Sequence, residues 1–150
     1  MARGCASTIF KVIDSQSKID PMSTDGKILN YGLRGDVEFV DVFFRYPARP
    51  DVIVHRGLSI KIKAGTTVAL VGSSGCGKST CIQLLQRFYD PIFGSVMLDD
   101  LDLRKYNLQW LRSNMAIVGQ EPVLFLGTIG LLLTKTIQKL SFLKFFPTFS

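Results

Sequence analysis

A glycine-rich run at Gly72–Thr80 has the residue types and the spacing needed to hold a polyphosphate. Three glycines let its backbone N–H groups approach phosphate oxygens closely: Gly72, Gly75 and Gly77. Lys78 supplies a point charge for the β- and γ-phosphates, and the Ser79 hydroxyl can ligate Mg²⁺. The first turn of a following helix would add a partial positive charge. The run therefore predicts a nucleotide-binding loop.

The segments on either side of this run fit that role. Before it, Val68–Val71 is apolar and predicts a buried strand over Thr67–Val71. After it, an apolar stripe at helical spacing predicts an amphipathic helix from about Lys78 to just before Asp90-Pro91. The members of the stripe are Cys81, Ile82, Leu85 and Phe88. The order of strand, loop and helix favours phosphate binding over a glycine-rich turn that has no ligand.

The bulk composition is that of one globular domain. The chain has 150 residues, of which 47% are hydrophobic, and no apolar stretch is long enough to span a bilayer. The net charge of +6 comes from basic residues scattered along the chain without a cluster, so we expect no nucleic-acid partner. Three cysteines without a C-x-x-C pair indicate a reducing environment, so we expect the isolated chain to be cytosolic or peripheral to a membrane.

The segments before the loop predict a helix, a connector and two strands. Apolar spacing predicts a short helix over Ala6–Asp14, and the polar Ser15–Arg34 is typical of a linker. Val37–Phe44 is rich in strand-forming residues, with a phase slip near Asp41 that indicates a bulge. Leu58–Lys63 alternates cleanly between apolar and polar residues. We expect these strands to form a half-exposed antiparallel sheet.

The segments after the loop predict a second strand–helix–strand series. Ser95–Leu98 is expected to be a strand, Asn107 can cap a short helix through Arg112, and Met115–Val118 predicts a second buried strand. The acidic pair Asp99-Asp100 could mark a Mg²⁺-binding strand end, but a brief strand preceded by a glycine favours a hairpin edge. We interpret the pair as a hairpin turn.

Four ordered motifs give the chain a specific resemblance: Tyr46-Pro47, Gly72–Thr80, Gln86–Pro91 and Val118–Phe125. With them the chain resembles the nucleotide-binding domains of ABC transporters, and most of all the first nucleotide-binding domain of P-glycoprotein-like multidrug-resistance exporters. The similarity runs from about residue 3 to residue 129. It implies an α/β fold of the P-loop NTPase class, incomplete here, with an antiparallel β subdomain.

The resemblance also implies individual roles. Tyr46 would stack its ring on adenine, and Gln120 would contact Mg²⁺ and the attacking water. Ser79 and Gln120 are then the expected metal ligands, and the expected cofactors are ATP and Mg²⁺. The complete set of expected nucleotide-binding residues is Tyr46, Gly72, Ser73, Gly75, Cys76, Gly77, Lys78, Ser79, Thr80 and Gln120.

The resemblance ends after Ile129. No Leu-Ser-Gly-Gly-Gln signature occurs, no acidic residue follows Glu121, and the only histidine, His55, precedes the loop. A catalytic carboxylate and a switch histidine are therefore not expected, and we predict a chain that binds Mg-ATP and does not hydrolyse it alone. We divide the chain into a helix end and linker at 1–34, part of a nucleotide-binding domain at 35–129, and a divergent apolar and basic tail at 130–150.

The expected setting is the cytoplasmic face of a membrane, with a transmembrane domain and a second nucleotide-binding domain as partners in efflux of amphipathic compounds. Three alternatives stay open. The chain could be a truncated isoform that docks on a transporter and inhibits it, or a remnant that does not fold because its sheet is left with an unpaired edge. It could also be a small P-loop kinase or GTPase whose metal strand ends at Asp99-Asp100.

Overall fold

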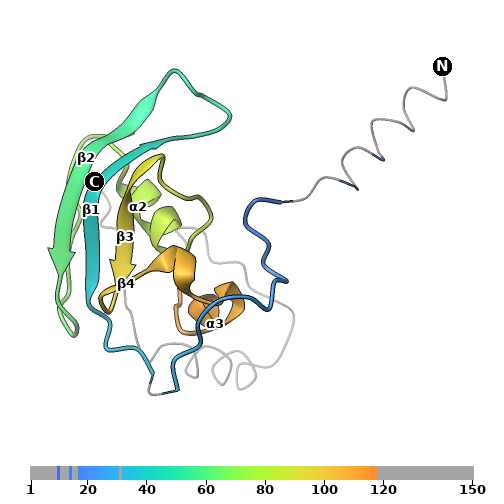
Figure 1. The fold of residues 1–150 in the computed structure, drawn as a ribbon. Coiled ribbons are helices and arrows are strands. Elements are labelled where there is room, and N and C mark those ends of the chain that lie inside the picture. Colours follow the sequence, from blue (N-terminus) through green and yellow to red (C-terminus); the bar gives the residue numbers. More distant parts are fainter. Residues whose placement is uncertain (1–9, 11–13, 15–16, 31, 118–150) are drawn as a thin grey trace, which may run out of the picture.

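The computed structural model describes Phe10, Asp14 and residues 17–30 and 32–117. Its elements, in chain order, are β1 (Val37–Arg45), β2 (Ile53–Ile62), α2 (Lys78–Leu85), β3 (Phe93–Leu98), β4 (Leu101–Asp102), the 3₁₀ helix η1 (Leu103–Lys105) and α3 (Leu108–Ser113) (Figure 1). The helix predicted over Ala6–Asp14 lies outside the described residues apart from Phe10 and Asp14.

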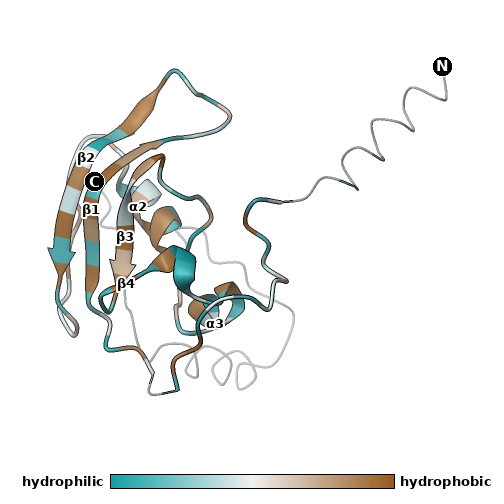
Figure 2. Ribbon diagram, in the orientation of Figure 1, coloured by the Kyte–Doolittle hydropathy of each residue, from teal (hydrophilic) through white to brown (hydrophobic). Residues whose placement is uncertain are grey.

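The strands form one four-stranded antiparallel sheet in the order β2-β1-β3-β4. Apolar and polar residues alternate along β1 and β2, so one face of the sheet is apolar (Figure 2). Phe39 and Phe44 from that face share a buried cluster with Leu84 and Leu85 of α2 and Leu111 of α3. The predicted antiparallel β subdomain is confirmed, and the helices on one face complete an α/β arrangement.

A bulge in β1 keeps its apolar residues on the inner face. The pairing with β2 shifts register between Phe39 and Val42, where Asp41 has a φ of 47°. Phe39 and Val42 are consequently both buried although three positions separate them. Strand β3, on the other side of β1, has Gly94 at this point, and a Cβ atom there would lie 2.2 Å from the carbonyl oxygen of Asp41. The phase slip predicted near Asp41 is thus a bulge that requires glycine opposite it.

Asp99 and Asp100 form the turn between β3 and β4, with φ angles of 50° and 64°. The Asp99 carboxylate accepts three backbone hydrogen bonds, from the N–H groups of Arg34 (2.6 Å), Gly35 (2.9 Å) and Asp36 (2.8 Å). The predicted hairpin is therefore present. Asp99 uses its carboxylate to hold the start of β1 against the turn.

Asn107 joins the linker to α3. Its side-chain oxygen accepts a hydrogen bond from the N–H of Trp110, as the predicted N-cap should. Its side-chain amide donates to the carbonyl oxygens of Ser23 and Asp25, and the Lys27 carbonyl accepts from the Asn107 N–H. One residue thus caps the helix and fixes the connector to it.

Helix α2 is shorter than predicted, because it ends at Leu85 and not near Asp90. Arg87 adopts a left-handed conformation with a φ of 53°, and the N–H of Phe88 donates to the carbonyl of Gln83. This is a Schellman ending with arginine where glycine is usual. Arg87 is held there by its ion pair with Asp90 (3.1 Å). Phe88 therefore leaves the predicted apolar stripe and is 47% exposed.

Two buried strands were predicted, one directly before the loop and one after the helix through Arg112, and the described residues form neither. Thr67–Val71 has no strand assignment, and Val71 is 87% exposed, although Val68 and Leu70 pack against the core. A strand needs a hydrogen-bonded neighbour, and no described segment pairs with this one. Residues 115–117 likewise have no strand assignment, and Val118 lies outside the described part. The first prediction is wrong for the described residues, and the second lies partly outside them.

Candidate phosphate-binding site

The loop at residues 72–77 connects the core to α2 through two glycines with positive φ. Gly75 has a φ of 80° and Gly77 a φ of 91°, a region that side chains rarely adopt. At Gly72 a Cβ atom would lie 2.7 Å from the sulfur of Cys76, so a side chain there would displace the Cys76 side chain. Ser73 is exposed, and its carbonyl accepts a hydrogen bond from the Cys76 N–H. The positive φ angles of Gly75 and Gly77 therefore shape the loop.

The ammonium group of Lys78 lies inside this loop. Its Nζ atom donates to the carbonyl oxygens of Gly72 (2.6 Å) and Ser73 (2.9 Å), and it lies 3.9 Å from the sulfur of Cys76. The loop backbone thus curves around a fixed positive charge.

Helix α2 begins directly at the loop, with Gly77 as its N-cap. The N–H groups of Lys78, Ser79 and Thr80 have no intrahelical partner because no helical turn precedes them, and the glycine N-cap offers no side-chain acceptor in its place. No acidic residue lies in this first turn. Together with Lys78, these groups form a site for an anion. The exposed Ser79 hydroxyl at the second helical position fits a metal ligand that must reach solvent.

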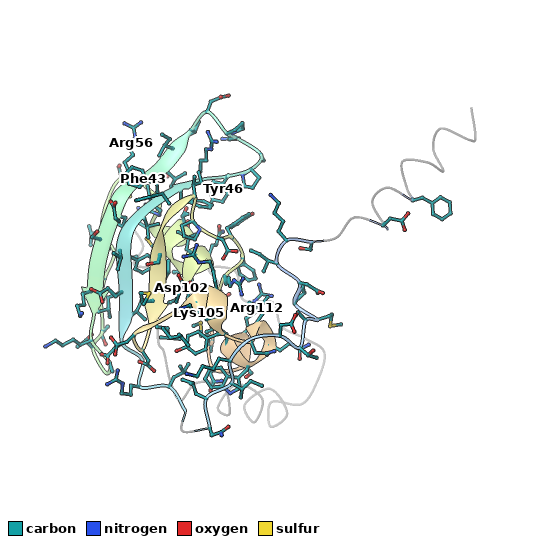
Figure 3. All side chains as sticks on the ribbon, in the orientation of Figure 1. Phe43, Tyr46, Arg56, Asp102, Lys105 and Arg112 are labelled. Carbon is teal, nitrogen blue, oxygen red and sulfur yellow. The ribbon has the colours of Figure 1, made fainter. Side chains whose placement is uncertain are left out.

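Thr80 and Tyr46 connect the site to β1. Thr80 is buried, and its hydroxyl oxygen lies 2.8 Å from the Tyr46 hydroxyl, which also donates to the side-chain oxygen of Gln83 (2.8 Å). Tyr46 directly follows β1 and is half-buried (Figure 3). The ring predicted to hold adenine is thus tied by its hydroxyl to the first two turns of α2.

The Tyr46 ring is packed edge-on by two other aromatic rings. Its centroid lies 5.0 Å from that of Phe44 at 81°, and 5.4 Å from that of Tyr89 at 89°. Perpendicular rings of this kind hold the Tyr46 plane in one orientation. Gln120, the other residue of the expected site that lies far from the loop in sequence, is outside the described residues.

His55 and Cys81 lie beneath the loop, and sequence reasoning gave neither of them a role there. His55 is 6% exposed, its Nε2 atom lies 3.7 Å from the sulfur of Cys81, and burial lowers the pKa of its imidazole. Burial also raises the pKa of the Cys81 thiol, to about 11. The alternation of β2 places His55 inward, which is the one sequence signal that could have indicated this contact.

In the described part of the chain, no group of three or more His, Cys, Asp or Glu side chains gathers to hold a metal ion. No helix in the same part is long and apolar enough to cross a membrane.

Comparison with known proteins agrees with this geometry. The family model described as ABC transporter matches residues 55–131, just over half of the chain. The multidrug resistance protein homolog 65 of Drosophila melanogaster is 84% identical over 129 residues, which cover 86% of this chain and 10% of that protein. The human ATP-binding cassette sub-family B member 5 is 52% identical over 124 residues, which cover 83% of this chain. The chain thus spans about a tenth of the length of these relatives.

A solved structure of a bacterial Atm1-family ABC exporter with ATP bound matches with a TM-score of 0.69 and 37% identity. The match covers 83% of this chain and 21% of the exporter chain. The described antiparallel sheet, loop and helix therefore have the arrangement found in a nucleotide-bound relative.

Proposed function

This chain belongs to the ABC transporter family, and from that premise we propose that it is the Mg-ATP-binding part of a multidrug-resistance-type exporter. The observation that carries the proposal is the position of the Lys78 ammonium, held by the carbonyl oxygens of Gly72 and Ser73 at the start of α2. A fixed positive charge, glycines with positive φ and a helix N-terminus meet at one point, and polyphosphate is the ligand that uses all three.

Each part of the nucleotide has a proposed binding residue. Tyr46 would hold the base, while Gly75, Gly77, Lys78 and Thr80 would hold the phosphates. Ser79 and Gln120 would ligate Mg²⁺, which when bound neutralises charge on the phosphates. Thr80 would contribute through its backbone N–H, because its hydroxyl is engaged with Tyr46.

The partners and the location are proposed on the same basis. We expect the domain to work at the cytoplasmic face of a membrane with a transmembrane domain and a second nucleotide-binding domain, in ATP-driven efflux of amphipathic compounds. Because no acidic residue follows Glu121 in the 150-residue chain, we expect this chain alone to bind ATP without turnover.

Thermal unfolding of the purified chain with and without Mg-ATP tests the proposal. Ligand at 100 times its dissociation constant should stabilise the fold by about 2.7 kcal/mol. Lys78→Ala should lose this stabilisation because it removes the charge from the loop. Lys63→Ala is the matched control, since Lys63 is an exposed lysine outside the loop, and it should retain the full effect. Equal stabilisation of both variants, or none in the parent chain, would contradict the proposal.

A further inference from the structure

His55, the only histidine in the chain, lies directly beneath the phosphate-binding loop. A Cβ atom on Gly77 would lie 2.5 Å from its Cε1 atom and 3.1 Å from its Nε2 atom. The imidazole therefore touches the backbone of the residue that caps α2. The Nε2 atom also lies 3.7 Å from the sulfur of Cys81, in the first turns of the same helix.

The surroundings of the ring favour its neutral form while the loop is empty. Burial disfavours an imidazolium and lowers the pKa of the ring, and the Cys81 thiol beside it is uncharged at neutral pH because burial raises its pKa to about 11. Cys76 lies in the loop itself, β1 places Phe44 opposite His55, and no acidic residue occurs in the first turn of α2. The neighbouring strand residue Arg56 is exposed and cationic. In the described part of the chain, no carboxylate is positioned to stabilise a charged ring.

A bound polyphosphate would instead favour the charged form of the His55 ring. It would bring several negative charges to the opposite side of Gly77, where Lys78 and the N-terminus of α2 are positive. We propose that His55 is a proton-binding site coupled to the phosphate-binding loop, so that bound nucleoside triphosphate favours the imidazolium and a protonated His55 tightens nucleotide binding. The inference rests on the proposed function. The coupling is reciprocal, because proton binding and nucleotide binding share one thermodynamic cycle.

Nuclear magnetic resonance can read this site directly, because one histidine gives one Hε1 signal, on the carbon atom nearest Gly77. The signal of the 150-residue chain would be followed from pH 5 to 8, empty and saturated with Mg-ATP. We expect the pH of half-protonation to rise by about one pH unit with Mg-ATP, which corresponds to about a tenfold change in affinity.

Calorimetric titration measures the same coupling from the nucleotide side, as the change of Mg-ATP affinity with pH. Between pH 8 and 5, the affinity of the parent chain for Mg-ATP should rise by up to about tenfold relative to His55→Leu. The comparison with this non-titrating variant is needed because phosphate groups of the nucleotide titrate in a similar range. A Lys78-dependent thermal shift with an unchanged His55 titration would overturn this inference and leave the proposed function standing. Absence of Mg-ATP binding would overturn both.

Discussion

The hydroxyl oxygens of Tyr46 and Thr80 lie 2.8 Å apart, which joins the end of β1 to the first turn of α2. Tyr46 is the expected adenine-binding ring, and Thr80 ends the phosphate-binding loop. The bond therefore fixes the distance between the two parts of the proposed nucleotide site. The second bond of the same hydroxyl, to Gln83, holds the ring at the next turn of the helix.

Two substitutions at Tyr46 should distinguish the contribution of its hydroxyl group from that of its ring. Tyr46→Phe removes hydrogen bonds to Thr80 and Gln83, so the free energy of unfolding should fall by about 1–2 kcal/mol. Because the ring remains, Mg-ATP affinity should change little. Tyr46→Ala removes the stacking surface as well, which should weaken binding by about 1–3 kcal/mol. Urea denaturation and calorimetric titration measure the two effects, and equal ATP affinity in both variants would argue against an adenine contact.

Asp99 should contribute to the stability of the fold and not to Mg²⁺ binding. Its carboxylate accepts three backbone N–H groups, so Asp99→Asn should lower the free energy of unfolding by about 2 kcal/mol. Asparagine tolerates the left-handed turn conformation, so the substitution changes mainly the charge. Asp100→Asn is the control: its side chain is 82% exposed, and the change should stay within about 0.5 kcal/mol. Loss of Mg²⁺-dependent ATP binding in Asp99→Asn would revive the metal-strand alternative.

Two glycine substitutions should distinguish backbone strain from lack of space. Gly65 has a φ of 72° and nothing within 4 Å of a Cβ atom, so Gly65→Ala should cost about 1 kcal/mol of stability. Gly94 has a φ of 82°, and its Cβ atom would lie 2.2 Å and 2.4 Å from two carbonyl oxygens of the β1 bulge. Gly94→Ala should therefore cost more than about 3 kcal/mol. Similar urea-unfolding midpoints for both variants would mean that the β1 bulge can shift at little cost to accommodate the alanine side chain.

The two described cysteines should differ sharply in reactivity. Cys76 is exposed, whereas Cys81 is buried and burial raises its pKa to about 11. At pH 8 only about a thousandth of Cys81 is thiolate, the form that reacts. Brief treatment with iodoacetamide followed by peptide mass spectrometry should find label on Cys76 and none on Cys81. The same treatment in urea should label both, and labelling of Cys81 should accelerate as the pH rises towards 11. Equal rates in the folded chain would contradict the burial of Cys81.

Features that depend on neighbours in the sequence were predicted well. The start of α2 at Lys78 follows from a glycine-rich turn, the cap on α3 from an asparagine before an apolar run, and the bulge at Asp41 from a break in alternation. Each of these features depends on only a few consecutive residues, whose conformations are already limited by the covalent chain. The end of α2 was missed because Arg87 takes a conformation that arginine rarely adopts, held by Asp90 and by Arg112, whose guanidinium donates to the Arg87 carbonyl.

The pattern of residue types was enough to predict the glycine-rich loop, its lysine and the family to which the motifs point. The folded structure was needed to show that Tyr46 is hydrogen-bonded to Thr80 and that His55 lies beneath Gly77. It also decided that Thr67–Val71 has no strand partner among the described residues. The physical reason is the same in each case. Contacts between segments far apart in the chain depend on how the sheet and helices pack, and no local pattern of residue types specifies that packing.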